Sequence, residues 1–143
     1  MSRSISFDVE LYKNTSAKAI LESLIKAGWN PIIDNAINYL PIGDNDMFDW
    51  TMEELTIDKL FEIIYLKEKM KETIGVQLNW ENTDIGVTLS ISNQKELYFI
   101  ISINTKYIDR DVYFVDFNWY AQKFLYPIQE IGEIFKYEFS FIY

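Results

Sequence analysis

The sequence predicts a single α+β domain over residues 1–143, in which about three helices pack on an antiparallel sheet of about six strands. Two patterns predict this fold. In several segments apolar residues occupy every second position, which is the period of a half-buried strand, and in three others they recur every three or four positions, which is the period of an amphipathic helix. The elements follow the order β-α-β-α-β-β-β-α-β, and the length suits one hydrophobic core.

The first three predicted elements are a strand, a helix and a short strand. Residues 4–12 form the first strand, because apolar side chains occupy every second position. The helix runs between N-cap candidates at residues 14–16 and Gly28, which suits a helix C-terminus. Residues 36–41 are predicted to form the short strand.

An acidic segment precedes the second helix. Residues 44–54 hold five acids and no base, which predicts an exposed loop. The helix begins either at Thr51, which with Glu54 matches a capping box, or at Thr56, and its apolar face runs to Met70.

Three strands separated by turns come next, at residues 76–80, 87–91 and 97–103. Their short connections predict an antiparallel meander. Because Tyr98 and Ile100 lie on the second face of the last strand, we expect that strand to be covered on both sides.

The chain closes with a helix and a strand. After a variable stretch at 104–115, Asp116 is the predicted N-cap, and Pro127 is predicted to kink or end the helix. Residues 135–143 alternate so that one face is almost wholly aromatic, and we expect those rings to lie in the core. This strand is also a candidate edge for pairing with a second copy, so the oligomeric state stays open and includes a dimer.

Composition excludes several classes of chemistry. The chain contains neither cysteine nor histidine, which removes thiol nucleophiles, imidazole bases, zinc sites and disulfides. The five glycines form no phosphate-binding loop. We therefore expect no enzyme, no catalytic residue, no metal ligand and no cofactor; a hydrolase would need a pocket with convergent carboxylates and a raised pKa.

Charge narrows the range of partners. Thirteen Lys and Arg against 22 Asp and Glu give a net charge of −9, which repels nucleic acids and anionic membranes and attracts basic proteins. No apolar stretch reads as a signal peptide or a membrane span, so we expect a cytoplasmic protein that binds neither nucleic acid nor membrane.

The acidic charge is clustered. Residues 44–62 hold seven acids and one base, Lys59, and so carry −6 of the total −9. Phe48 and Trp50 lie inside this acidic run, and no amphipathic period would place both of their side chains on a buried face. Clustered acids with aromatic anchors suit docking to a basic cleft, whereas a solubilising loop with Trp50 folded back onto the core edge is the alternative. The candidate partner-binding residues are Asp44, Asp46, Phe48, Asp49, Trp50, Glu53 and Glu54.

Five sequence blocks carry a resemblance: residues 7–12 (FDVELY), 28–29 (GW), 40–41 (LP), 44–50 (DNDMFDW) and 116–120 (DFNWY). Together they resemble a group of small acidic bacterial proteins that is similar to the immunity proteins of polymorphic and contact-dependent toxin systems. The resemblance implies a protein that binds and neutralises a cognate toxin with a basic surface, such as a nuclease. The alternative is a non-catalytic regulatory module that binds a basic protein or a small cationic ligand on its sheet face.

Overall fold

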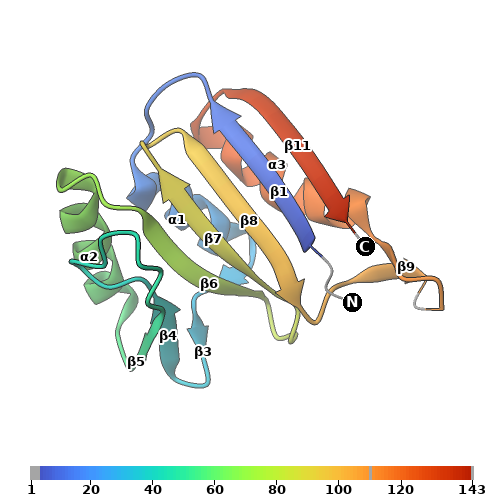
Figure 1. Cartoon of the computed structure of the whole chain (residues 1–143), viewed down its shortest axis with the longest axis horizontal. Coiled ribbons are helices and arrows are strands. Elements are labelled where there is room, and N and C mark those ends of the chain that lie inside the picture. Colours follow the sequence, from blue (N-terminus) through green and yellow to red (C-terminus); the bar gives the residue numbers. More distant parts are fainter. Residues whose placement is uncertain (1–3, 110, 143) are drawn as a thin grey trace.

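The computed structural model describes residues 4–109 and 111–142, so Tyr143 of the last predicted strand lies outside the described residues. It confirms the α+β fold, with three helices and antiparallel strand pairing (Figure 1). The number of strands was underestimated, because the large sheet has nine strands and not about six. Among the described helices, none is long and apolar enough to cross a membrane.

Seven strands of the large sheet follow the path β11-β1-β8-β7-β6-β4-β3. Their bounds are Ile134–Ile142 (β11), Ser4–Leu11 (β1), Glu96–Ile103 (β8), Gly86–Ser92 (β7), Ile74–Trp80 (β6), Ala36–Tyr39 (β4) and Ile32–Ile33 (β3). The predicted meander is confirmed, since β6, β7 and β8 pair antiparallel in succession. In Figure 1, β1 lies between β8 and the red β11.

The strands that the sequence did not predict are short. β2 (Trp29–Asn30) pairs with β6, and β5 (Thr51–Glu53) pairs with β4, so the end of the predicted acidic loop is a strand. The stretch at 104–115 contains a separate two-stranded ribbon of β9 (Tyr107–Asp109) and β10 (Phe114–Val115). Strands of two or three residues are too short for alternation to reveal them.

Helices α1 (Ala17–Ala27) and α3 (Phe117–Ile131) lie behind the sheet in Figure 1, and α2 (Ile57–Lys69) stands at the end beyond β6. The core forms on the helix side, where Phe7 of β1 and Phe99 of β8 both contact the ring of Phe124 in α3. The opposite face of the central strands carries no helix, so it is open.

One prediction of burial was wrong, and a second was wrong in part. The second face of β8 is open, with Tyr98 exposed by 41% and Ile100 by 38%, because the helices pack on the other face only. The prediction for the aromatic residues of β11 holds only in part: Phe139 and Phe141 are half-buried and pack against the core, whereas Phe135 and Tyr137 are each exposed by 54%. β11 is an edge strand, and α3 covers only part of its aromatic face.

The helix ends follow the predicted signals. Ser16 caps α1 by accepting a hydrogen bond from Ala19 N at 3.0 Å, and Thr56, not Thr51, caps α2 by accepting one from Lys59 N at 3.1 Å. Asp116 caps α3. Gly28 ends α1 at φ +131°, and a Cβ added there would lie 2.7 Å from the Trp80 ring, so only glycine fits.

Pro127 does not end the last helix, which was one of the two outcomes predicted for it, since α3 continues through it to Ile131. A proline leaves the carbonyl four residues earlier without its helical donor, here that of Lys123. The indole Nε1 of Trp29 donates to Lys123 O at 3.1 Å and replaces this bond. The Pro127 carbonyl accepts a hydrogen bond from Ser23 Oγ at 2.6 Å, which ties α3 to α1.

We predict that Trp29→Phe destabilises the fold by about 1–3 kcal/mol, because it leaves the Lys123 carbonyl buried without a donor. The loss is expected to be smaller in a Pro127→Ala background, where an amide at position 127 becomes available to Lys123 O. A double-mutant cycle in urea measures this coupling. Trp119→Phe, in the same aromatic cluster, is the control, and equal coupling to Pro127→Ala in both cycles would refute the explanation.

Candidate binding site

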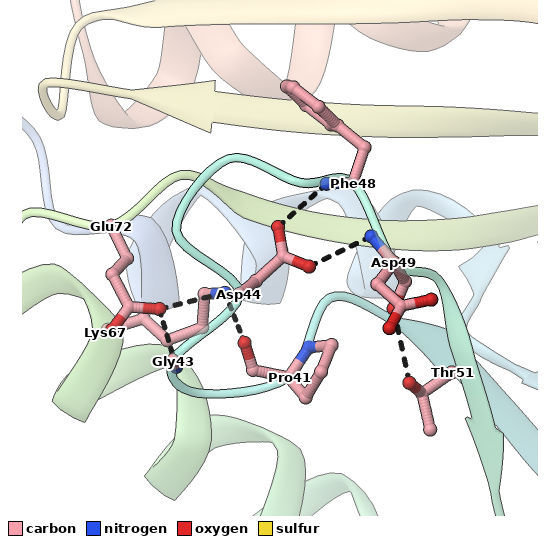
Figure 2. Close-up of polar contacts among 8 residues, drawn as sticks. All are labelled: Pro41, Gly43, Asp44, Phe48, Asp49, Thr51, Lys67 and Glu72. Carbon is pink, nitrogen blue, oxygen red and sulfur yellow. Dashed lines mark hydrogen bonds and ion pairs between the residues drawn. The ribbon is translucent and has the colours of Figure 1, made fainter.

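The acidic loop is held together by Asp44, which is only 8% exposed. Its carboxylate accepts hydrogen bonds from Phe48 N at 2.9 Å and from Asp49 N at 2.8 Å (Figure 2). Its carbonyl accepts one from Met47 N at 3.1 Å. Asp44 therefore organises the backbone of the loop and does not present its carboxylate to solvent.

A buried lysine fastens the same loop to α2. Lys67 is 1% exposed, and its Nζ donates to Pro41 O at 2.8 Å and lies 3.5 Å from Glu72 Oε1. Glu72 in turn accepts a hydrogen bond from Gly43 N at 2.9 Å (Figure 2). The start of the loop is thus held by a charged network, which fixes where the rest of the loop lies.

Phe48 is held in an unusual conformation. Its φ of +53° lies in the left-handed region, which is strained for a bulky side chain. Its ring is 52% exposed and projects from the loop toward the open sheet face in Figure 2. The two hydrogen bonds of Asp44 keep the backbone in this state.

Trp50 folds back onto the sheet, as one of the two sequence interpretations expected. It is half-buried, and a Cβ added to Gly75 of β6 would lie 2.9 Å from its Cη2 and 2.6 Å from Leu40 Cδ1. Because Gly75 has no side chain, the indole of Trp50 and the side chain of Leu40 can pack directly against its backbone. Phe48 and Trp50 form one wall of a cavity of about 640 Å³ on the open face.

The floor of this groove consists of residues that the register places side by side across the sheet. One row runs from β11 to β6 through Glu138, Asp8, Tyr98, Ser90 and Gly75. The next row runs from β11 to β7 through Lys136, Glu10, Glu96 and Ser92. We name the space between these rows and the wall of Phe48 and Trp50 the acidic groove. Four of its lining side chains are acids and one is a lysine.

Asp8 is a half-buried acid of the groove. Burial raises the pKa of its carboxyl group, the charge of the opposing Glu138 raises it further, and Lys136 acts against both. Among the described residues, its Oδ1 is the buried side-chain oxygen for which no hydrogen-bond partner is found. The carboxyls of Asp8 and Glu138, on directly opposed positions, can share a cationic group of a ligand.

The structure separates the predicted binding residues into four groups. Phe48 and Trp50 line the acidic groove, and Asp44 lies inside the loop. Asp46 and Asp49 are exposed on the loop beside the groove, whereas Glu53 and Glu54 lie on and after β5, where Glu53 Oε1 accepts a hydrogen bond from Tyr39 OH at 3.0 Å.

Sequence reasoning missed the groove floor, although one signal was present. The polar positions of the alternating strands, Asp8 and Glu10 in β1 and Glu138 in β11, all belong to the open face. Only the register shows that they meet. Lys67 was also missed as a structural residue, although it lies three and four positions after Ile64 and Ile63 on the apolar face of α2.

Comparison with known proteins yields no relatives: no protein-family model, no curated protein and no solved structure matches the chain. Within residues 4–109 and 111–142, no group of three or more potential ligands is arranged to hold a metal ion.

We predict that Asp44→Asn destabilises the protein by about 1–2 kcal/mol, because one oxygen that accepts a backbone N–H becomes an amide donor. The amides of Phe48 and Asp49 should then exchange faster with deuterium. Asp46→Asn removes the same charge from an exposed side chain and is expected to stay within about 0.5 kcal/mol. Urea unfolding and hydrogen exchange measure both variants, and equal effects would contradict the role assigned to Asp44.

The raised pKa of Asp8 predicts how the stability of the protein changes with pH. A carboxyl group whose pKa is higher in the folded than in the unfolded state stabilises the fold when the pH is below the ordinary pKa of 3.8. This contribution is lost as the pH rises through the pKa of the folded state. Asp8→Asn should therefore be more stable than the parent at pH 7, with the difference closing toward pH 3.8. Thermal unfolding across this range checks it, and a variant less stable than the parent at pH 7 would contradict it.

Proposed function

We propose that this chain is a non-catalytic, immunity-type protein that binds and neutralises a basic partner protein, a cognate bacterial toxin, through the acidic groove and Phe48. The observation that carries the proposal is the state of Phe48: its ring is 52% exposed while its φ of +53° is held by the Asp44 carboxylate. An aromatic side chain kept exposed on a strained backbone is typical of functional loops, where the strain fixes the contact geometry before binding.

The charges around Phe48 support a basic partner. Asp46 and Asp49 flank it on the loop, and the carboxylates of Asp8, Glu10 and Glu138 line the groove below. Such a field raises the rate of encounter with a positively charged surface, while a desolvated ring slows dissociation. A toxin with a basic cleft, such as a nuclease, has the complementary surface, and we place this binding in the cytoplasm.

The proposal is tested with the product of the gene next to this one, purified and titrated by calorimetry at low and high salt. Phe48→Asn should weaken the complex by about 30-fold, as expected for an interface anchor. It should keep or raise the thermal stability, because asparagine tolerates positive φ. Tyr126→Ala, an aromatic exposed by 69% on α3, is the control and should bind normally.

Three outcomes would contradict this proposal. They are the absence of a complex with the neighbouring gene product, unchanged affinity in Phe48→Asn, and affinity that does not fall with salt. Turnover of aryl glycosides that disappears in Glu138→Gln would contradict the non-catalytic assignment, because opposed carboxyls with one raised pKa also suit hydrolysis.

A second candidate function is a regulatory module that binds a small organic cation. It is favoured by the size of the acidic groove, about 640 Å³, and by the buried Asp8 Oδ1 for which no partner is found. Aromatic side chains and carboxylates together bind cations well. Spermidine, titrated while tryptophan fluorescence is followed, should bind in the micromolar range and bind at least about tenfold more weakly to Glu138→Gln. Equal binding to Glu138→Gln would exclude the groove as its site.

A further inference from the structure

β11 forms an open edge of the large sheet. Within the described residues it pairs with β1 on one side only, and it spans nine residues, whereas the strand at the other end of the path, β3, has two. Phe135 and Tyr137 are exposed by 54%, and Ile142 by 61%. A long edge with exposed apolar side chains and no proline is a template for another strand.

The charges of β11 are arranged in a self-complementary way. Lys136 and Glu138 both face the open side of the sheet, on either side of Tyr137 in the sequence. Within one chain they form a loose ion pair, with Lys136 Nζ 3.8 Å from Glu138 Oε2 and both side chains more than 60% exposed. Such a pair contributes little by itself and is free to bond across an interface.

We propose that β11 pairs antiparallel with β11 of a second copy of this chain, in the register that places Tyr137 opposite Tyr137. In this register each Lys136 lies opposite a Glu138. The pair then contains two opposite-charge contacts on the open face and the Tyr137–Tyr137 aromatic contact on the helix face. Cross-strand pairs of both kinds stabilise antiparallel sheets.

Symmetry and charge select this register among the alternatives. A two-fold axis perpendicular to the sheet keeps the helices of both copies on one side, so opposed residues must belong to the same face of β11. A register centred on Lys136 places two lysines opposite each other, and one centred on Glu138 places two glutamates opposite each other. Centring on Tyr137 avoids both and pairs each charge with its opposite.

The dimer would bring the two acidic grooves together. Lys136 and Glu138 of β11 line the outer side of the groove, and the symmetry places both open faces on the same side of the joined sheet. Lys136 and Glu138 belong to both the edge and the groove, whereas Tyr137 is not among the residues that line the groove. Cross-linking at Tyr137 therefore tests dimerisation separately from the proposed function.

The chain has no cysteine, so single cysteines can report the register without background. Tyr137→Cys should form a disulfide-linked dimer under mild oxidation, because opposed residues have Cα atoms about 4.5–5.5 Å apart. Phe135→Cys is the matched control, since Phe135 has the same exposure as Tyr137. In the proposed register its own copy lies four positions, about 13 Å, away, which is beyond the reach of a disulfide.

Charge variants test the same pairing without cross-linking. Analytical ultracentrifugation of the full chain should show a concentration-dependent dimer. Lys136→Glu should weaken it by about tenfold or more, because two attractive contacts become repulsive. The swap of Lys136→Glu with Glu138→Lys restores opposite charges across the interface and should restore the parental affinity.

A chain that remains monomeric at millimolar concentration would overturn the proposal. It would also be overturned if Phe135→Cys cross-linked as readily as Tyr137→Cys, or if the charge swap dimerised no better than Lys136→Glu. Circular dichroism of each variant confirms that it is folded. If Tyr137→Cys misfolds, the charge variants alone test the proposal, because they alter exposed side chains.

Discussion

Packing of the helices against a single face of the large sheet determines most of this architecture. The buried side chains of β1 and β8 occupy alternate positions and contact α3 on one side. The positions between them lie on the opposite face, and in β1 they are serine, aspartate and glutamate. The acidic groove is a direct result, because antiparallel register aligns these polar positions into rows across neighbouring strands. The loop at 41–50 covers the part of this face over β6.

The longer elements were predictable because their periods repeat several times. The first strand, the meander and the caps at Gly28 and Asp116 all follow from local signals, whereas the choice of Thr56 over Thr51 does not. The helix through Pro127 was not predictable in this way. Its continuation depends on Trp29, which is 94 residues from Lys123 in the sequence and supplies the missing donor. Local rules describe the disruption that proline causes but cannot identify a distant side chain that compensates for it.

The candidate site likewise contains residues that local sequence signals indicate and residues that only the topology identifies. Charge clustering drew attention to the loop with Phe48 and Trp50, and both line the groove. It could not distinguish an acid that faces solvent from Asp44, whose oxygens serve the loop backbone. The floor, with Asp8 and Glu138, required the pairing of β1 with β11, which are more than a hundred residues apart. Composition indicated the kind of surface, and topology determined which residues form it.

The position of β1 between β8 and β11 has a consequence for how the chain acquires its fold. Val9 pairs with Leu97 on one side and with Tyr137 on the other, so neither partner strand exists until most of the chain has been synthesised. Contacts of such long sequence separation slow folding, because a large loop must close before they form. During translation β1 therefore has no partner strand, and its apolar side chains are exposed to association with other nascent chains. The last strand to be synthesised thus completes the pairing of the first.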